Sequence, residues 1–359
     1  MELPNVQRLS PLVTRILGQN PGKFTLQGTN TYLIGRSPPY ILIDTGEGDK
    51  PEYINYLKSH LDQSSSSQPE TCPISDIILT HKHFDHHGGL PDVLNHLLSR
   101  QMASVWSPPR VHIHPLPYGT ADPSLTRTIF QLQEESYTPH TGSPFVPLAD
   151  GTKLRTKDES AELEVLHTPG HTADSICLVL RSVSPPSTPV SEGLFTADTV
   201  LGVGTGVFED LTTYIPSLHR LVDLPDIWPV PIYPGHGPIV PPESAKSYIE
   251  TYITHREARE KQILDVLQKE GGRLSVRGIV RPLYAEYPES LWAAAAHGVG
   301  LHLKKLEAEG RARRVDAGEG GAEGSSVEGE RLEVVGAAGM DIEWELVSSS
   351  ESRAAYKSQ

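Results

Sequence analysis

The most chemically informative part of the sequence is a histidine-rich stretch at residues 80–89. It reads Thr80-His81-Lys82-His83-Phe84-Asp85-His86-His87-Gly88-Gly89. Four side chains of the kinds that bind metals, at positions 81, 83, 85 and 86, follow the apolar run Ile77-Ile78-Leu79. From the end of a strand, three imidazoles and a carboxylate can point into one cavity. This spacing predicts a metal site.

Three later segments resemble the first on a smaller scale, because each ends an apolar run with a ligand-type residue near a glycine. They are Thr168-Pro169-Gly170-His171-Thr172, Phe195-Thr196-Ala197-Asp198-Thr199 and Tyr233-Pro234-Gly235-His236-Gly237. Alone, each segment is typical of a turn with a satisfied polar side chain. In this order after the first cluster they form one set, and the seven ligand-type residues predict two metal sites.

The elements that must position these residues alternate between strands and helices. Tyr32–Ile34 and Tyr40–Ile43 predict a β-hairpin around a turn rich in glycine and proline, and residues 51–61 have helical spacing. Further strands are expected at 77–79, 111–113, 163–166 and 176–180, with a helix at 90–100, before a Ser/Pro-rich insertion at 182–191. The first 240 residues or so therefore have an α/β or α+β pattern.

The pattern becomes strongly helical from about Ser244. We expect helices at 244–269, 274–284 and 290–309, followed by strands Arg311–Val315 and Arg331–Val335 joined by a Gly/Glu-rich stretch at 317–330 that we expect to be disordered. Three helices and a hairpin predict a winged-helix domain. The predicted domains are 1–243 (catalytic), 244–347 (winged-helix-like) and 348–359 (a disordered tail).

Composition narrows the possible functions of the 359-residue chain. The 31 basic and 45 acidic residues give a net charge of −14, so the overall field repels nucleic-acid backbones. No apolar run approaches the roughly 18 residues of a membrane span, and the two cysteines are too few for a disulfide framework or a cysteine-rich zinc module. With no secretory signal at its start, the chain is expected to be cytoplasmic, with the mitochondrial matrix as an alternative.

The H-x-H-x-D-H cluster, the Gly-His, the strand-end aspartate and the late Gly-His-Gly resemble the metallo-β-lactamase superfamily. The resemblance implies an α/β fold, the αββα sandwich, with a dinuclear metal site at one sheet edge. It assigns His81, His83 and His171 to the first metal, Asp85, His86 and His236 to the second, and Asp198 as the bridge between them. Two Zn²⁺ ions per chain are expected, although iron or manganese also suits these ligands.

A longer set of motifs resembles one branch of that superfamily. Gly18-x-Asn20-Pro21-Gly22, the run Leu26-Gln27-Gly28-Thr29-Asn30-Thr31-Tyr32, and Ile43-Asp44-Thr45-Gly46 are similar to the branch that holds a mitochondrial lactamase-like endoribonuclease and fungal polyketide-cluster thioesterases. In that branch a winged-helix domain follows the catalytic domain. The low-complexity loops of this chain suit a filamentous-fungal protein.

The expected mechanism is hydrolysis by a hydroxide that bridges the two metals. Asp85 is expected to have a catalytic role, because it could handle a proton as its coordination loosens. Asp44 is expected to orient a ligand histidine, and His87 is more in keeping with a supporting histidine than with a catalytic acid. Tyr214 is interpreted equally as lining the substrate cleft or as a helix-packing residue.

Three functions compete on this evidence. The favoured one is a thioesterase that releases an acyl or polyketide chain from an acyl carrier protein or polyketide synthase in fungal secondary metabolism, with Arg256, Arg259 and Lys261 as a candidate docking patch. The alternative is an endoribonuclease that cleaves single-stranded RNA. Its basic cluster is Lys304, Lys305, Arg311, Arg313 and Arg314. A non-catalytic binding protein is disfavoured, because all seven ligand positions are filled.

Overall fold

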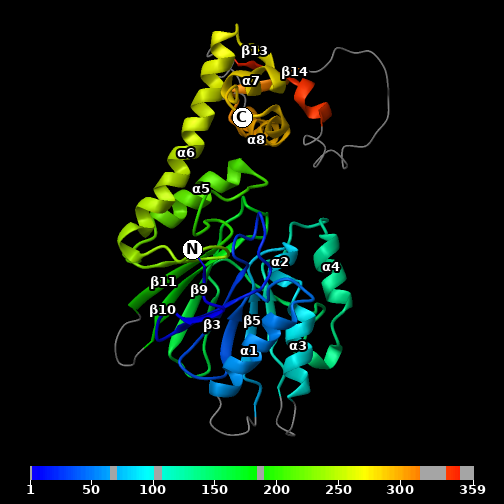
Figure 1. Cartoon of the computed structure of the whole chain (residues 1–359), viewed down its shortest axis with the longest axis vertical. Helices are drawn as coiled ribbons and strands as arrows, with labels where there is room; N and C mark the ends of the chain where they lie inside the picture. Colours follow the sequence, from blue (N-terminus) through cyan, green and yellow to red (C-terminus); the bar gives the residue numbers. More distant parts are fainter. Residues whose placement is uncertain (1, 65–70, 101–106, 184–189, 316–336, 348–359) are drawn as a thin grey trace. The chain divides into compact units, whose positions relative to one another are not determined.

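The computed structural model describes residues 2–64, 71–100, 107–183, 190–315 and 337–347. The chain forms two compact units (Figure 1). The first comprises Met1–Glu209 and Thr213–Tyr252, and the second comprises Asp210–Thr212 and Ile253–Gln359. The domain limits expected from the sequence stay predictions. Among the described residues, no helix combines the length and the apolar character that a membrane crossing requires.

The first sheet of the first unit runs through seven strands in chain order. They are β1 (Val6–Arg8), β2 (Val13–Leu17), β3 (Asn30–Ile34), β4 (Tyr40–Ile43), β5 (Ile74–Leu79), β6 (Arg110–Ile113) and β7 (Val146–Pro147). Strands β1 to β4 pair antiparallel, which confirms the predicted hairpin, and β4 to β7 pair parallel. The sheet therefore changes from a meander into a parallel arrangement whose strands all end at the same edge.

The second sheet has five strands in the order β12-β11-β10-β9-β8. They are β8 (Lys153–Arg155), β9 (Ala161–His167), β10 (Ile176–Ser182), β11 (Val190–Ala197) and β12 (Ile232–Pro234). Strand β10 pairs antiparallel with both neighbours, whereas β11 and β12 are parallel. Parallel pairing brings the ends of β11 and β12, and the residues that follow them, to the same place.

Side-chain alternation divides the core of the first unit into layers. Leu33, Leu42 and Ile77 point outward and pack with helices α1 (Pro51–Ser64) and α3 (Leu90–Ser99), which lie beside β5 in Figure 1. Their neighbours Tyr32, Ile41 and Ile78 point inward and pack against the second sheet.

Helix α5 (Leu211–Val222) lies against the segments that follow the second sheet's strands. Its Ser217 hydroxyl donates to the Pro169 carbonyl after β9, and its Tyr214 hydroxyl donates to the Thr199 carbonyl after β11. The first unit is therefore an αββα sandwich, as the sequence predicted.

The second unit is a small three-stranded sheet packed with helices, and it confirms the predicted winged helix. Strands β13 (Arg273–Ser275), β15 (Glu343–Leu346) and β14 (Ala312–Val315) pair antiparallel in that order. Helices α7 (Val276–Leu283), α8 (Trp292–Ala308) and the end of α6 (Pro242–Lys269) supply a core that includes Ile263, Ile279 and Leu303. The apolar side chains along one face of α8, among them Ala296, Val299 and Leu306, thus pack in this core.

Some elements differ from the sequence expectation. The segment 274–284, expected to be a helix throughout, begins with the last two residues of strand β13. The helix starts only at Val276, because Ser275 is its N-cap and accepts from the Gly278 N–H. Residues 115–147 contain a helix, α4 (Pro123–Phe130), that the sequence analysis did not predict. The expected strand 331–335, the stretch 317–330 and the tail from 348 lie outside the described residues, as do 184–189 of the Ser/Pro-rich insertion, whose ends extend β10 and β11.

Candidate metal centre

The seven predicted ligands gather where the two sheets meet. His81 and His83 follow β5, His171 follows β9, Asp198 follows β11 and His236 follows β12. Asp85 and His86 lie in the short helix α2 (Phe84–His87). Backbone bonds join the two sheets at this edge, since the Ile176 N–H donates to the Thr80 carbonyl at 3.0 Å and the Asn30 N–H to the Gly235 carbonyl at 2.7 Å.

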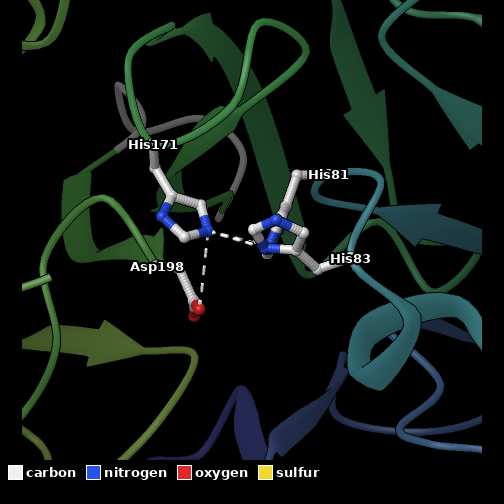
Figure 2. A group of neighbouring side chains, drawn as sticks. All are labelled: His81, His83, His171 and Asp198. Atoms are coloured by element: carbon white, nitrogen blue, oxygen red, sulfur yellow. Dashed lines mark hydrogen bonds and ion pairs between the residues drawn. The ribbon is translucent and has the colours of Figure 1, made fainter. Parts of the chain in front are cut away.

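The first group brings three ring nitrogens together. His81 Nε2 and His83 Nδ1 are 3.1 Å apart, His171 Nε2 and His81 Nε2 3.2 Å, and His171 Nε2 and His83 Nδ1 2.9 Å. Figure 2 shows the rings converging, with the Asp198 carboxylate facing them. Asp198 Oδ2 lies 3.7 Å from His171 Nε2.

The second group is formed by Asp85, His86 and His236. Asp85 Oδ2 lies 3.1 Å from His236 Nε2 and 3.4 Å from His86 Nε2. The Asp198 carboxylate reaches this group too, with Oδ1 3.4 Å from His86 Nε2 and Oδ2 3.3 Å from His236 Nε2. Asp198 therefore lies between the two groups.

Contacts behind His81, His86 and His171 fix which ring nitrogen of these three ligands faces the centre. Asp44 Oδ2 lies 2.8 Å from His86 Nδ1 and also accepts from the Thr80 hydroxyl, which in turn contacts His81 Nδ1. The Val207 carbonyl accepts from His171 Nδ1 at 2.7 Å. Each contact ties up Nδ1 and leaves Nε2 directed at the centre. The expected orienting role of Asp44 matches this geometry.

The donor set fits metal ions. His86 Nε2 and Asp198 Oδ1 are buried and have no hydrogen-bond partner among the described residues, which fits atoms that would coordinate an ion. A tetrahedral ion with Zn–N bonds of about 2.0–2.1 Å separates its ligand nitrogens by about 3.3 Å, close to the spacing of the three nitrogens of the first group. Imidazole and carboxylate ligands without cysteine suit zinc, iron or manganese.

The electrostatics of the two groups differ. Burial, assisted by the neighbouring His171, lowers the pKa of His83 to about 4, and burial among histidines holds the pKa of His81 well below its usual range. Burial also opposes the charging of His236, but Asp198 and Asp85 outweigh it and raise the pKa of His236 to about 9. In the first group, burial thus favours the neutral forms of His81 and His83, whereas the carboxylates around the second group attract positive charge.

Two polar residues in the loop before β3 also support the centre. The Thr29 hydroxyl donates to Asp85 Oδ2 at 3.2 Å, and Asn20 holds Thr29 by accepting from its N–H and donating to its hydroxyl. Both side chains are buried. The motif that contains these residues resembles one branch of the superfamily, and its density of small polar residues next to a strand is the sequence signal for a role at the site.

A glycine beside a ligand is required by space. A Cβ on Gly235 would lie 2.3 Å from Asp198 Oδ1 and 3.0 Å from His86 Cε1. Any side chain there would displace a ligand, which explains the Gly-His pair at 235–236.

The remaining candidates are supporting residues. His87 is fully buried, and its ring lies between the Lys82 carbonyl (2.9 Å) and the Thr128 hydroxyl (3.0 Å), so it braces the ligand loop rather than facing the centre. Tyr214 is buried and stacks on Phe208, which favours packing over a place in a cleft.

Comparisons with known proteins agree with this picture. The sequence model described as the metallo-beta-lactamase superfamily matches residues 24–236, and the model of the beta-lactamase associated winged helix domain matches residues 275–321. The chain is 40% identical over 313 residues to a beta-lactamase-like protein 2 homolog of Drosophila melanogaster, covering 87% of this chain and 93% of that protein.

A second relative carries an activity in its name. The chain is 32% identical over 289 residues to an atrochrysone carboxyl ACP thioesterase of Claviceps purpurea, covering 79% of this chain and 76% of that one. Among solved structures, a beta-lactamase domain protein from Burkholderia ambifaria aligns with a TM-score of 0.62 at 15% identity, over 95% of this chain and 93% of that one. That likeness concerns the fold.

Proposed function

Because this chain belongs to the metallo-β-lactamase superfamily of hydrolases, we propose that it is a dinuclear zinc hydrolase that cleaves acyl thioesters. The observation that carries the proposal is the pair of adjoining donor groups, one of three imidazoles and one of two imidazoles and a carboxylate, with Asp198 between them. His81, His83 and His171 would hold one ion, and Asp85, His86 and His236 the other.

Zinc supplies two kinds of chemistry when it is bound in such a centre: it polarises a carbonyl as a Lewis acid, and it lowers the pKa of water toward neutrality. The chain's own residues orient the reaction. In hydrolysis the oxygen of water forms a bond to the acyl carbon, the C–S bond breaks, and the sulfur leaves as a thiol that carries one proton of the water. No serine, cysteine or threonine nucleophile is required.

Asp85 is the candidate for moving that proton. Its Oδ2 is held by the Thr29 hydroxyl and faces His236, and its carboxylate is partly exposed, unlike the buried side chain of His86. A proton taken by this carboxylate can be passed to the departing sulfur as the product leaves.

Charge and ion pairing favour an acyl thioester over RNA. In the described part of the second unit, Lys305 and Arg311 pair with Glu260 and Glu309. Arg313 likewise pairs with Glu345. The basic cluster that would bind an RNA backbone is therefore largely neutralised, in a chain of net charge −14. Thioesterase-named relatives add support, and their substrates suggest an acyl carrier protein as the partner.

An endoribonuclease is the second candidate, because the winged helix is a fold used on nucleic acids and a two-metal centre also suits phosphodiesters. The Drosophila relative is more similar than the thioesterases, and its name states no substrate.

The test offers both substrates to one zinc-loaded preparation of the full chain: an acyl carrier protein loaded with an acyl thioester, and a labelled single-stranded RNA. We expect release of the acyl group and an intact RNA. His83→Ala should abolish the release and lower the bound zinc, whereas His219→Ala, at an exposed histidine of α5 outside both groups, should do neither. RNA cleavage with an untouched thioester would reverse the ranking.

A further inference from the structure

Four large apolar side chains of the first unit are exposed on segments that also contact the ligand groups. Phe24 is 72% exposed, Phe84 45%, Val203 53% and Val207 56%. We call these four side chains the apolar rim. Exposed apolar side chains around a reaction centre are typical of a surface that a ligand covers.

Two members of the rim are attached directly to ligand residues. Phe84 lies between the ligands His83 and Asp85 and begins helix α2, with its ring 5.8 Å from that of His87. Val207 orients His171, because the Val207 carbonyl accepts from His171 Nδ1 at 2.7 Å. Both residues therefore belong to the segments whose backbone positions the ligand imidazoles.

The other two members, Phe24 and Val203, come from loops that meet beside the ligand His236 of the second group. The Gly202 N–H donates to the His236 carbonyl at 2.9 Å, which fixes the loop that carries Val203. A Cβ built on Gly237 would lie 3.3 Å from both Val203 N and Leu26 Cδ1, so this loop and the loop of Phe24 converge beside the ligand His236. The Phe24 loop is closed by the Gly22–Leu26 backbone bond and continues into Thr29, which contacts Asp85.

Two lysines of the described chain lie close in sequence to rim residues, and both have contacts. Lys82, between the ligands His81 and His83, pairs with Glu209 at 2.9 Å. Lys23 lies over the Phe24 ring, 5.6 Å from its centre. An apolar surface with a paired lysine suits an uncharged chain better than a polyanion.

We propose that the apolar rim binds the acyl chain of the substrate, so that the enzyme prefers long or aromatic acyl groups to acetyl. This inference rests on the proposed thioesterase function. The four exposed side chains belong to segments that contain or contact ligands of both groups, and the acyl carbon must sit at these groups for its carbonyl to react.

The test measures kcat/KM of the zinc-loaded full chain for acetyl, hexanoyl and decanoyl thioesters of N-acetylcysteamine. Complete burial of one methylene group is worth about fourfold in affinity, and on an open rim we expect about twofold per methylene. Binding of the decyl thioether of N-acetylcysteamine, which cannot be hydrolysed, should follow the same trend in calorimetry.

Matched variants separate the rim from general damage. Val203→Ala combined with Val207→Ala should lower the ratio of decanoyl to acetyl kcat/KM about fivefold or more. Val190→Ala is the control, because Val190 is a similarly exposed valine (59%) at the start of β11, the opposite end of the strand from Asp198. It should leave the ratio unchanged.

Phe24 distinguishes a chain-binding surface from a base-stacking one. Phe24→Leu should keep most of the decanoyl preference and Phe24→Ala should lose it, because leucine replaces the apolar area but not the aromatic face. Equal loss in both variants, together with RNA cleavage, would replace the acyl chain by a stacked base. Thioester hydrolysis with no dependence on chain length would contradict the proposed binding of the acyl chain by the apolar rim, but it would support the proposed thioesterase function. Failure to hydrolyse any thioester would overturn both.

Discussion

Single contacts behind the ligands determine how the centre is organised. Asp44 accepts from the Thr80 N–H at 2.8 Å and from its hydroxyl at 2.9 Å, and lies 2.8 Å from His86 Nδ1. One buried carboxylate thus supports a ligand of the second group directly and a ligand of the first group, His81, through Thr80. Asp44 follows β4 directly and has a left-handed backbone conformation (φ 57°), which aspartate and asparagine tolerate better than most residues.

Asp44→Asn should weaken zinc binding by about 10–100-fold, because the amide no longer presents two charged acceptor oxygens to His86 and Thr80. Competitive titration with a chelating dye measures the affinity. Asp49→Asn is the matched control: Asp49 has the same φ of 57° and is exposed, so the exchange repeats the backbone demand without touching a ligand. Equal zinc affinities in the two variants would contradict the role of Asp44.

Another buried carboxylate predicts a pH dependence of stability. Burial raises the pKa of Asp174 to about 6, although the Thr172 hydroxyl and Lys82 offset part of the rise. The folded protein therefore holds this proton more tightly than the unfolded chain, whose aspartates titrate near 3.9. Its contribution to stability is present below about pH 4 and is lost as the pH rises through about 6.

Asp174→Asn should remove that loss. The free energy of unfolding of the variant, relative to that of the unsubstituted chain, should therefore be about 2 kcal/mol higher at pH 8 than at pH 4. Urea unfolding of the metal-free protein between pH 4 and pH 8 gives the free energy of unfolding for both forms. The variant's curve should be flatter across the window from pH 4 to 6. A parallel pair of curves would show that Asp174 titrates in the folded protein as it does in the unfolded chain.

At the scale of the elements, the sequence predicted best the strands that are formed by continuous apolar runs. Apolar runs such as Ile77-Ile78-Leu79 and Ile176–Leu180 form strands β5 and β10. The ligand-type residues follow β5, β9, β11 and β12, and the parallel strands β11 and β12 end at one edge. Strands β7 and β8 have only two or three residues, too few for a pattern to show. Helix α4 was missed because its eight residues follow a proline-rich segment, and its signals are local: Asp122 caps it and Pro123 begins it.

His87 connects helix α4 to the ligand loop. His87 Nε2 donates to the Lys82 carbonyl, and His87 Nδ1 contacts the Thr128 hydroxyl on α4. His87→Ala should therefore loosen α4, with backbone amides that exchange about tenfold faster, since a lost buried hydrogen bond costs about 1–1.5 kcal/mol. Hydrogen exchange read by mass spectrometry on residues 123–130, with His219→Ala as control, measures this. Unchanged exchange would mean that the core packing of Leu125 and Ile129 holds the helix without the His87 contact.

At the scale of the whole molecule, the sequence identifies the candidate metal ligands more fully than it identifies the substrate. The ligands are constrained by metal chemistry, so their residue types and spacing carry the signal. Substrate preference depends on side chains such as Phe24 and Val203, on loops whose conformation has no periodic pattern. Net charge could be counted from the sequence, but the pairing of Lys305 and Arg311 with Glu260 required coordinates, because these partners are distant in the sequence and come together only through the fold.

Zinc should stabilise the folded chain, because the ligands converge only in the folded state, where the buried His86 Nε2 and Asp198 Oδ1 have no hydrogen-bond partner among the described residues. At a free zinc concentration one hundred times the dissociation constant, one site contributes about 2.7 kcal/mol. For a unit of this size that corresponds to a rise in Tm of roughly 5–10 °C. Scanning calorimetry of the protein after chelation and after reloading with zinc measures the shift, and elemental analysis counts the ions. His83→Ala should show a smaller shift than Asp49→Asn, which keeps every ligand. A Tm that does not respond to zinc in the unsubstituted chain would mean that the two groups do not form a zinc centre.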